Sequence, residues 1–177
     1  MKKLVVSSPR AETSGRLVLA FTQSLHHDEI KPILRKYQLE PVDPDAWYPQ
    51  QRLLDVFREI QEGHTNVSQN LVAIGMKGAE TAAYPPEIDS IKTALLALPL
   101  IHELNHRNIP NVGLEYEVQI LGDRHIQVTN HSPYPNDTLY GFIWEIVKRF
   151  KPAESQFTIY IVDRKAEDAT FDIQWTE

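Results

Sequence analysis

Apolar residues in the first two-thirds of the chain recur with the spacing of amphipathic helices. This pattern predicts helices over about residues 14–25, 28–37, 49–63, 67–81 and from 87 to shortly before Pro110. Ser14 precedes the first apolar stripe and is suited to cap that helix. Pro99 interrupts the last stripe, so we expect it to kink or divide the helix.

The last third of the chain changes to the alternating pattern of half-buried strands. Apolar and polar residues alternate over 114–120, and the alternation resumes at Ile126 and Val128 after a Gly-Asp turn, as in an antiparallel hairpin. A broad apolar stripe over 139–150 predicts one long amphipathic helix. Two further alternating segments, 157–161 and 171–175, predict two more strands.

This order of elements predicts an α+β fold, in which an N-terminal helical half packs on a small C-terminal antiparallel sheet with one long amphipathic helix. We expect a single domain over residues 1–177, with a helical part over about 12–110 and a sheet-containing part over about 112–177. The chain has no internal repeat or low-complexity tract.

Composition excludes several classes of function. The 177 residues include no cysteine, which excludes disulfides, Cys-ligated zinc and thiol nucleophiles. A net charge of −6 argues against a nucleic-acid partner, since that binding depends on clustered cations. No apolar run approaches the roughly 20 residues of a membrane span, and the start lacks the apolar region of a secretion signal. We therefore expect a soluble, cytoplasmic protein.

One motif suggests chemistry. His102-Glu103-x-x-His106 matches the zinc motif in which two histidines bind the metal and the glutamate activates water. On an unbroken helix both imidazoles would share a face. However, the motif lies in the last turn before Pro110, and no third ligand follows at a familiar spacing. A zinc-dependent hydrolase that uses His102, His106 and Glu103 as base is therefore our alternative function.

Four segments carry a resemblance to known families. They are LIHELNHR at 100–107, YEV at 116–118, SPYP at 132–135 and YGFI at 140–143. In this order they resemble haem-nitric-oxide-binding-like domains and the related 4-vinyl-reductase-type ligand-binding domains. The resemblance implies a helical first half, a hairpin, a helix opened by a glycine and two terminal strands. It also implies a pocket between the helices and the sheet that senses or holds a small apolar molecule.

On this resemblance, six residues are expected near the pocket: Trp47, Tyr48, His102, His106, Tyr134 and Tyr140. Haem-binding members hold the haem carboxylates with a Tyr-x-Ser-x-Arg motif, and its places fall near Thr129, His131 and Pro133 here. Because the motif is missing, we expect no cofactor. Haem ligated by His102 or His106, and zinc, are the alternatives.

We therefore predict a non-enzymatic small-molecule-binding or sensory and regulatory domain, because no complete catalytic set is present. The resemblance implies a small apolar ligand and either a homodimer or a signalling protein as partner. A domain that only contacts other proteins, without a ligand, is a third hypothesis.

The loop over residues 130–137 is expected to be well defined and close to the pocket. Pro133 and Pro135 restrict their own backbone and that of the residues before them. We expect Asn136 or Asp137 to cap the following helix. Tyr134 would then point into the core or over the mouth of the pocket.

Overall fold

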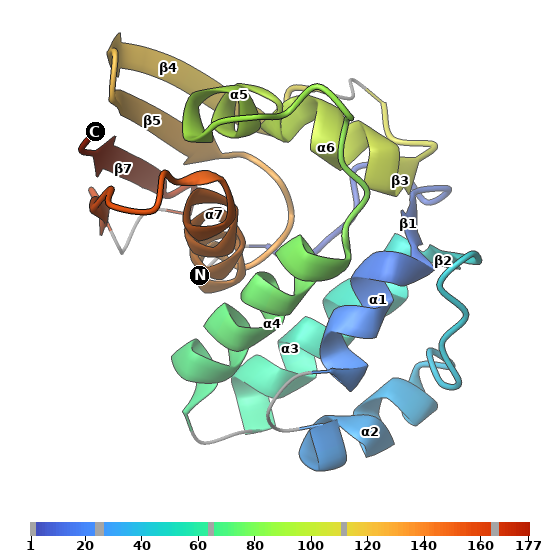
Figure 1. Ribbon diagram of the computed structural model, residues 1–177. Coiled ribbons are helices and arrows are strands. Elements are labelled where there is room, and N and C mark those ends of the chain that lie inside the picture. The colour runs from blue at the N-terminus through green and yellow to red at the C-terminus, as the bar shows by residue number, and fades with distance from the viewer. Residues whose placement is uncertain (1–2, 24–26, 64–65, 111–112, 164–166) are drawn as a thin grey trace.

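The structure is a computed structural model that describes residues 3–23, 27–63, 66–110, 113–163 and 167–177. Helices and two antiparallel sheets make up an α+β fold, in which helices form the first half of the chain and most strands the last third (Figure 1). In this part of the chain, no helix is long and apolar enough to cross a membrane.

The first half builds a helical core of its own. Its elements are β1 (Glu12–Ser14), α1 (Gly15–Thr22), α2 (His27–Lys36), β2 (Trp47–Pro49), α3 (Gln50–Gly63) and α4 (Val67–Thr81). The apolar stripes of the helices meet around Phe21 and Phe57, whose ring centroids lie 4.9 Å apart in an edge-on arrangement.

The second half covers one face of a sheet with helices. Its elements are α5 (Ile91–Leu96), α6 (Leu98–Asn105), β3 (His106–Arg107), β4 (Tyr116–Gly122), β5 (His125–Asn130), α7 (Asn136–Phe150), β6 (Phe157–Ile161) and β7 (Thr170–Trp175). The four-stranded sheet has the order β4-β5-β7-β6, with every pair antiparallel. Alternate residues of its central strands, such as Val128 and Phe171, are fully buried in a core shared with Ile143 and Val147 of α7.

Pro99 divides the long helix as expected, because α5 ends at Leu96 and α6 begins at Leu98. The pattern of the chain did not predict the second sheet, which has the order β2-β1-β3. Its strands have only two or three residues, too few for alternation to be recognised. In this sheet His106 pairs with Thr13, which ties the end of α6 to the helical half.

Helices α4 and α7 cross in direct backbone contact. A Cβ atom on Gly75 would lie 1.9 Å from the carbonyl oxygen of Thr138, and a Cβ atom on Gly141 would lie 2.1 Å from that of Val72. Only glycine permits these approaches. The two residues therefore make the crossing that joins the helical half to the sheet half.

The loop before α7 is held by side chains, although not by the expected helix cap. Helix α7 begins at Asn136, after Pro135, and has no side-chain cap. The Asn136 side chain instead accepts a hydrogen bond from Nδ2 of Asn130, at 2.9 Å. Asp137 accepts one from the hydroxyl of Ser68, at 2.5 Å, which adds a second contact between α4 and α7. Because Pro135 occupies the cap position, Asn136 and Asp137 lie inside the first turn and their side chains bind the loop and α4 instead.

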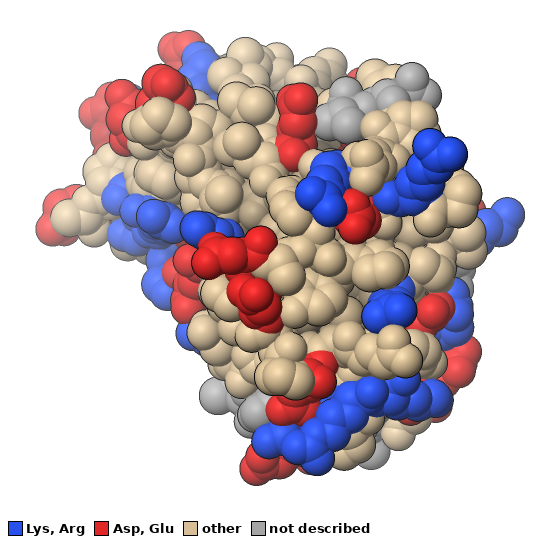
Figure 2. Space-filling view, turned by 90° about the vertical axis from the view of Figure 1, so that its right-hand side faces the viewer, with Lys and Arg blue, Asp and Glu red and all other residues tan. Residues whose placement is uncertain are grey.

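The molecular surface seen in Figure 2 carries basic and acidic side chains close together. On α2, Lys31 and Arg35 both pair with Glu40, and Lys36 pairs with Glu59. Cations that already have acidic partners contribute less to binding of a phosphate backbone. This pairing gives no support to a nucleic-acid partner on α2.

Candidate functional site

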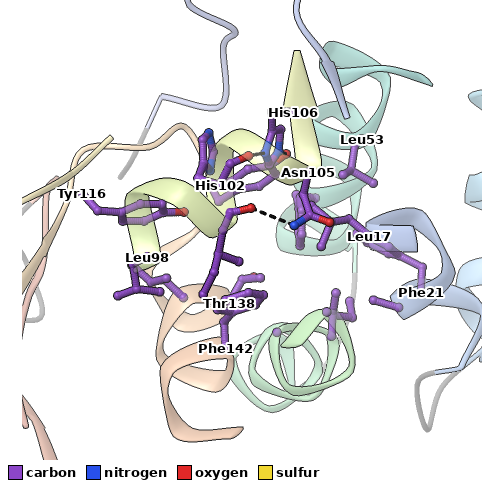
Figure 3. A pocket seen from close by; sticks show the side chains of 18 residues that line it. Leu17, Phe21, Leu53, Leu98, His102, Asn105, His106, Tyr116, Thr138 and Phe142 are labelled. Carbon is purple, nitrogen blue, oxygen red and sulfur yellow. Dashed lines mark hydrogen bonds between the residues drawn. The ribbon is translucent and has the colours of Figure 1, made fainter. Parts of the chain in front are cut away.

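A cavity of about 70 Å³ lies where the helical core meets the core of the sheet half (Figure 3). Its apolar walls are Leu17, Ala20, Phe21, Leu53, Phe57, Ile74, Gly75, Gly78, Leu98, Ile101, Leu139 and Phe142. Its polar lining residues are His102, Asn105, His106, Tyr116, Tyr134 and Thr138. None of these lining residues is a lysine, arginine, aspartate or glutamate, so the cavity favours an uncharged occupant.

Two lining residues, Thr138 and His102, have a buried side-chain atom without a hydrogen-bond partner in the described part of the chain, and His102 is the one whose atom is a ring nitrogen. His102 lies on α6, is only 4% exposed, and its Nε2 atom has no hydrogen-bond partner among the described residues. Burial, with a smaller contribution from His106, lowers the pKa of His102 well below its ordinary value. The ring is therefore neutral at neutral pH. A neutral imidazole with a free nitrogen is suited to a ligand or a metal.

His106 has both ring nitrogens occupied. Its Nδ1 lies 2.9 Å from the carbonyl oxygen of His102, and its Nε2 lies 2.6 Å from the hydroxyl of Tyr134. Burial lowers the pKa of His106 to about 4 and raises that of Tyr134 to about 12, so both side chains are neutral. Gln50, the first residue of α3, donates from Nε2 to the Tyr134 oxygen at 3.2 Å.

This geometry does not support the zinc-hydrolase alternative. Helix α6 ends at Asn105, so His106 lies in β3 and the two histidines do not share a helical mount. Neither nitrogen of His106 is free for a metal. Glu103 is exposed while both histidines are buried. Within the described ranges, no group of three His, Cys, Asp or Glu side chains could hold a metal ion.

The six residues expected near the pocket fall into two groups. Those that line the cavity are His102, His106 and Tyr134. Trp47 instead packs against the guanidinium group of Arg107, which lies 4.7 Å from its ring centroid. The hydroxyl of Tyr48 accepts the backbone N–H of Asp43, at 2.8 Å. Tyr140 packs in the core of the sheet half.

Sequence reasoning missed three polar lining residues. The ring of Tyr116 meets that of His102 edge-on, at 5.3 Å between centroids, and burial raises the pKa of Tyr116. Thr138, in the first turn of α7, has a buried Oγ1 atom without a hydrogen-bond partner in the described part of the chain. Asn105 is the third. The alternation along β4 could have indicated Tyr116, because Tyr116 lies on the same apolar strand face as Val118.

Asn105 anchors the end of α6. Its Nδ2 donates to the carbonyl oxygens of Ile101 and Ala83, at 2.7 and 3.0 Å. Its Oδ1 accepts from the backbone N–H of Ala83 and from the hydroxyl of Ser14. Ser14 precedes α1 as expected but makes no side-chain cap there, because its hydroxyl is directed to Asn105. The site is thus braced from both halves.

No protein-family model and no curated protein matches this chain. Solved structures match it over most of its length. An H-NOX protein from S. oneidensis in the Fe(II)NO ligation state superposes with a TM-score of 0.66 and 12% identity, covering 93% of this chain and 99% of that one. An oxygen-binding H-NOX domain related to soluble guanylate cyclases superposes with a TM-score of 0.59 and 13% identity, covering 92% of this chain and 93% of that one.

A third structure, on modulating haem redox potential through protein-induced porphyrin distortion, gives a TM-score of 0.65 and 14% identity, with 92% of this chain and 93% of that one covered. It contradicts our expectation that no cofactor is bound, because a chain with the same fold is a haem protein. In this chain, the free nitrogen of His102 fits an axial ligand of haem iron. Identity this low establishes architecture alone, and the chain has the H-NOX fold.

Proposed function

We propose that this chain is a sensory domain that binds a small ligand in the cavity beside His102. The observation that carries the proposal is the unpaired Nε2 of a buried, neutral imidazole in a largely apolar cavity between the two halves. Apolar walls favour an uncharged ligand, and the unpaired polar atoms of His102 and Thr138 give that ligand an orientation. No charged side chain lines the cavity, which favours binding over acid–base or nucleophilic catalysis.

The fold comparison brings haem into this proposal. His102 is the residue that would hold the iron, through Nε2. When bound, haem supplies an iron that takes a small gas molecule. The cavity of about 70 Å³ is well below the roughly 300–1,000 Å³ of ordinary small-molecule sites. The helices around it must therefore separate to admit a molecule of more than a few atoms.

A haemin titration of the full chain tests the haem form of the proposal. We expect the absorption band of ligated haem to appear with the wild-type chain and to be lost in His102→Ala. His131→Ala is the matched control, because His131 does not line this cavity. A band that survives in His102→Ala would exclude His102 as the ligand.

Xenon tests the cavity without haem, since it is a single apolar atom and an apolar cavity of about 150 Å³ is known to bind it. We expect xenon under pressure to shift the NMR signals of the Ile74 and Ile101 methyl groups, which line the cavity. Methyl signals of sheet residues that do not line the cavity, such as that of Ile159, should stay unchanged. If haemin gives no band that depends on His102 and xenon shifts no cavity signal, the proposed function is refuted.

Three further expectations belong to this proposal: one domain over residues 1–177, a cytoplasmic location, and a homodimer or signalling protein as partner. The partner is supported by three exposed leucines, Leu96, Leu100 and Leu104, on the helices that lead to and carry His102. Sedimentation of the wild-type chain beside Leu100→Glu tests the dimer. A monomer at all concentrations would exclude it.

A further inference from the structure

Four side chains from separate parts of the fold form a continuous chain of contacts that ends at the cavity. Gln50 opens α3, Tyr134 lies in the loop before α7, His106 begins β3 and His102 lies on α6. Hydrogen bonds connect Gln50 to Tyr134 at 3.2 Å, Tyr134 to His106 at 2.6 Å, and His106 to the carbonyl of His102 at 2.9 Å. All four residues are buried.

Chemistry sets the direction of each hydrogen bond. The carbonyl oxygen of His102 can only accept, so Nδ1 of His106 carries the hydrogen. The lowered pKa of His106 keeps its ring neutral, which leaves Nε2 as an acceptor for the Tyr134 hydroxyl. The Tyr134 oxygen then accepts from the amide of Gln50. If the Gln50 amide were flipped, its Oε1 and Nε2 of His106 would both need the single hydroxyl hydrogen of Tyr134.

His106 in turn contacts the ring of His102 face to face. The two ring centroids lie 3.9 Å apart and the planes differ by 16°, while Tyr116 meets the His102 ring edge-on from another side. Nε2 of His102 has no hydrogen-bond partner among the residues that the structure describes, so it does not hold the ring in place. The His102 ring instead contacts three other rings, because His106 stacks on it and Tyr116 and Tyr134 both meet it edge-on, Tyr134 at 6.4 Å between centroids.

We propose that Tyr134 is a positioning residue of the cavity: the His102 carbonyl sets the tautomer of His106, the Tyr134 hydroxyl donates to its Nε2 and holds the ring in one plane, and the stacked His106 ring fixes the orientation of His102. The inference rests on the proposed function in treating His102 as the group that meets the ligand. It concerns only the protein's own contacts, and it holds with or without haem.

The tautomer can be measured in the ligand-free, ¹⁵N-labelled full chain by long-range ¹H–¹⁵N NMR of the imidazoles. We expect the hydrogen of His106 on Nδ1, with Nε2 unprotonated and shifted by an accepted hydrogen bond. This measurement needs no substitution. A hydrogen on Nε2 of His106 would overturn the inference by itself.

Tyr134→Phe removes the hydroxyl and keeps the ring. We expect Nε2 of His106 to move to the position of a free imine nitrogen, and the ring signals of His102 to shift or broaden as the stack loosens. Tyr116→Phe is the matched control, because the Tyr116 ring also contacts His102 while its hydroxyl interacts with Ser132, and it should leave the His106 nitrogens unchanged. If Tyr134→Phe moves the His106 signals but not those of His102, Tyr134 does not position His102.

Binding of haemin provides a separate readout. Loss of one hydrogen bond behind the ligand is expected to weaken haemin binding about fivefold to tenfold in Tyr134→Phe, with Tyr116→Phe affected less. Equal weakening in both variants would count against a positioning role for Tyr134. A wild-type chain that takes no haemin would contradict the haem form of the proposed function, while the tautomer and the His102 shifts would still decide the role of Tyr134.

Discussion

Burial gives His102 and His106 the same charge state but leaves them different tasks. Both are neutral because the loss of surrounding water disfavours the imidazolium form. His106 uses both nitrogens to join β3, α6 and the loop before α7, whereas Nε2 of His102 is unpaired. His106 thus acts as a brace, and the unpaired Nε2 of His102 is the atom that we propose meets a ligand.

The stability of the chain should fall as the pH is lowered from about 6.5 toward about 4. The pKa of His106 is about 4 in the folded chain, against an ordinary value of 6.5, and that of His102 is lowered too. Below pH 6.5 the histidines bind protons in the unfolded chain but stay neutral in the folded chain, which favours unfolding. The contribution of the two histidines to the free energy of unfolding is therefore fully present above pH 6.5 and is lost as the pH falls. The slope is about 1.4 kcal/mol per pH unit for each histidine.

Urea unfolding at pH values between 7.5 and 4.5 checks this expectation. The double variant His102→Gln, His106→Gln should have a flatter profile over the same range, because the two depressed groups are gone. The lowered pKa values of the Glu12 and Asp172 carboxyl groups affect stability mainly near and below pH 4.5, at the lower end of this range, and they act equally in both proteins. A wild-type profile as flat as that of the double variant would contradict the assignment.

At the scale of elements, the crossing of α4 and α7 decides how the two halves meet. Gly75 and Gly141 bring the helix backbones together, and the bond from Ser68 to Asp137 lies at the same pair of helices. Phe142, one residue beyond Gly141, lines the cavity with Gly75 and Gly78. The crossing therefore forms part of the cavity wall, and a change in its spacing would change the cavity.

Gly75→Ala should destabilise the chain by about 3 kcal/mol or more, because the new methyl group would lie 1.9 Å from a backbone oxygen that cannot move alone. Gly78→Ala is the matched control in the same helix. Its methyl group would meet the Phe142 ring at 3.6 Å, an ordinary contact, and alanine favours the helix by about 0.5–1 kcal/mol. Urea unfolding of both variants checks the contrast, and similar stabilities would contradict the close crossing.

The loop before α7 should depend on Asn130, which is fully buried. Its Oδ1 accepts from the backbone N–H and the hydroxyl of Ser132, and its Nδ2 donates to the Tyr134 carbonyl and to Asn136. Asn130→Ala removes these bonds and should cost about 2–4 kcal/mol of unfolding free energy. A loss below about 1 kcal/mol in urea unfolding would show that the loop is held by other contacts.

At the scale of the whole molecule, the two cores share one boundary made of backbone contact, hydrogen bonds and the cavity. We expect the chain to unfold in a single cooperative transition. Trp47 reports on the helical half, and Trp144 on the sheet half. Single-tryptophan variants should give the same urea midpoint as far-ultraviolet circular dichroism. Two separate midpoints would mean that the halves unfold as independent units.

Most of the fold could be predicted from the sequence, because helices and strands of normal length show their periods in the spacing of apolar residues. The division at Pro99, the hairpin and the amphipathic helix before the last two strands all follow from local pattern. The small sheet was missed because its strands are too short, and the cap of α7 was wrong because the helix begins at Asn136 itself, with Pro135 at the cap position, while the Asn136 and Asp137 side chains bind Asn130 and Ser68. A capping preference read from neighbouring residues fails where the same side chain binds a residue far away in the sequence, as Asp137 does with Ser68.

For the site, the sequence by itself determined which residues had useful chemistry, including His102, His106 and Tyr134. Only the tertiary structure decided what each one does. Gln50 and Tyr134 are 84 positions apart, and Tyr134 and His106 are 28 apart, so no local pattern shows that they meet. The end of α6 at Asn105 turns one histidine into a brace and leaves the other unpaired. Hydrogen bonds and desolvation depend on neighbours in space, and those neighbours are fixed only when the two halves pack together.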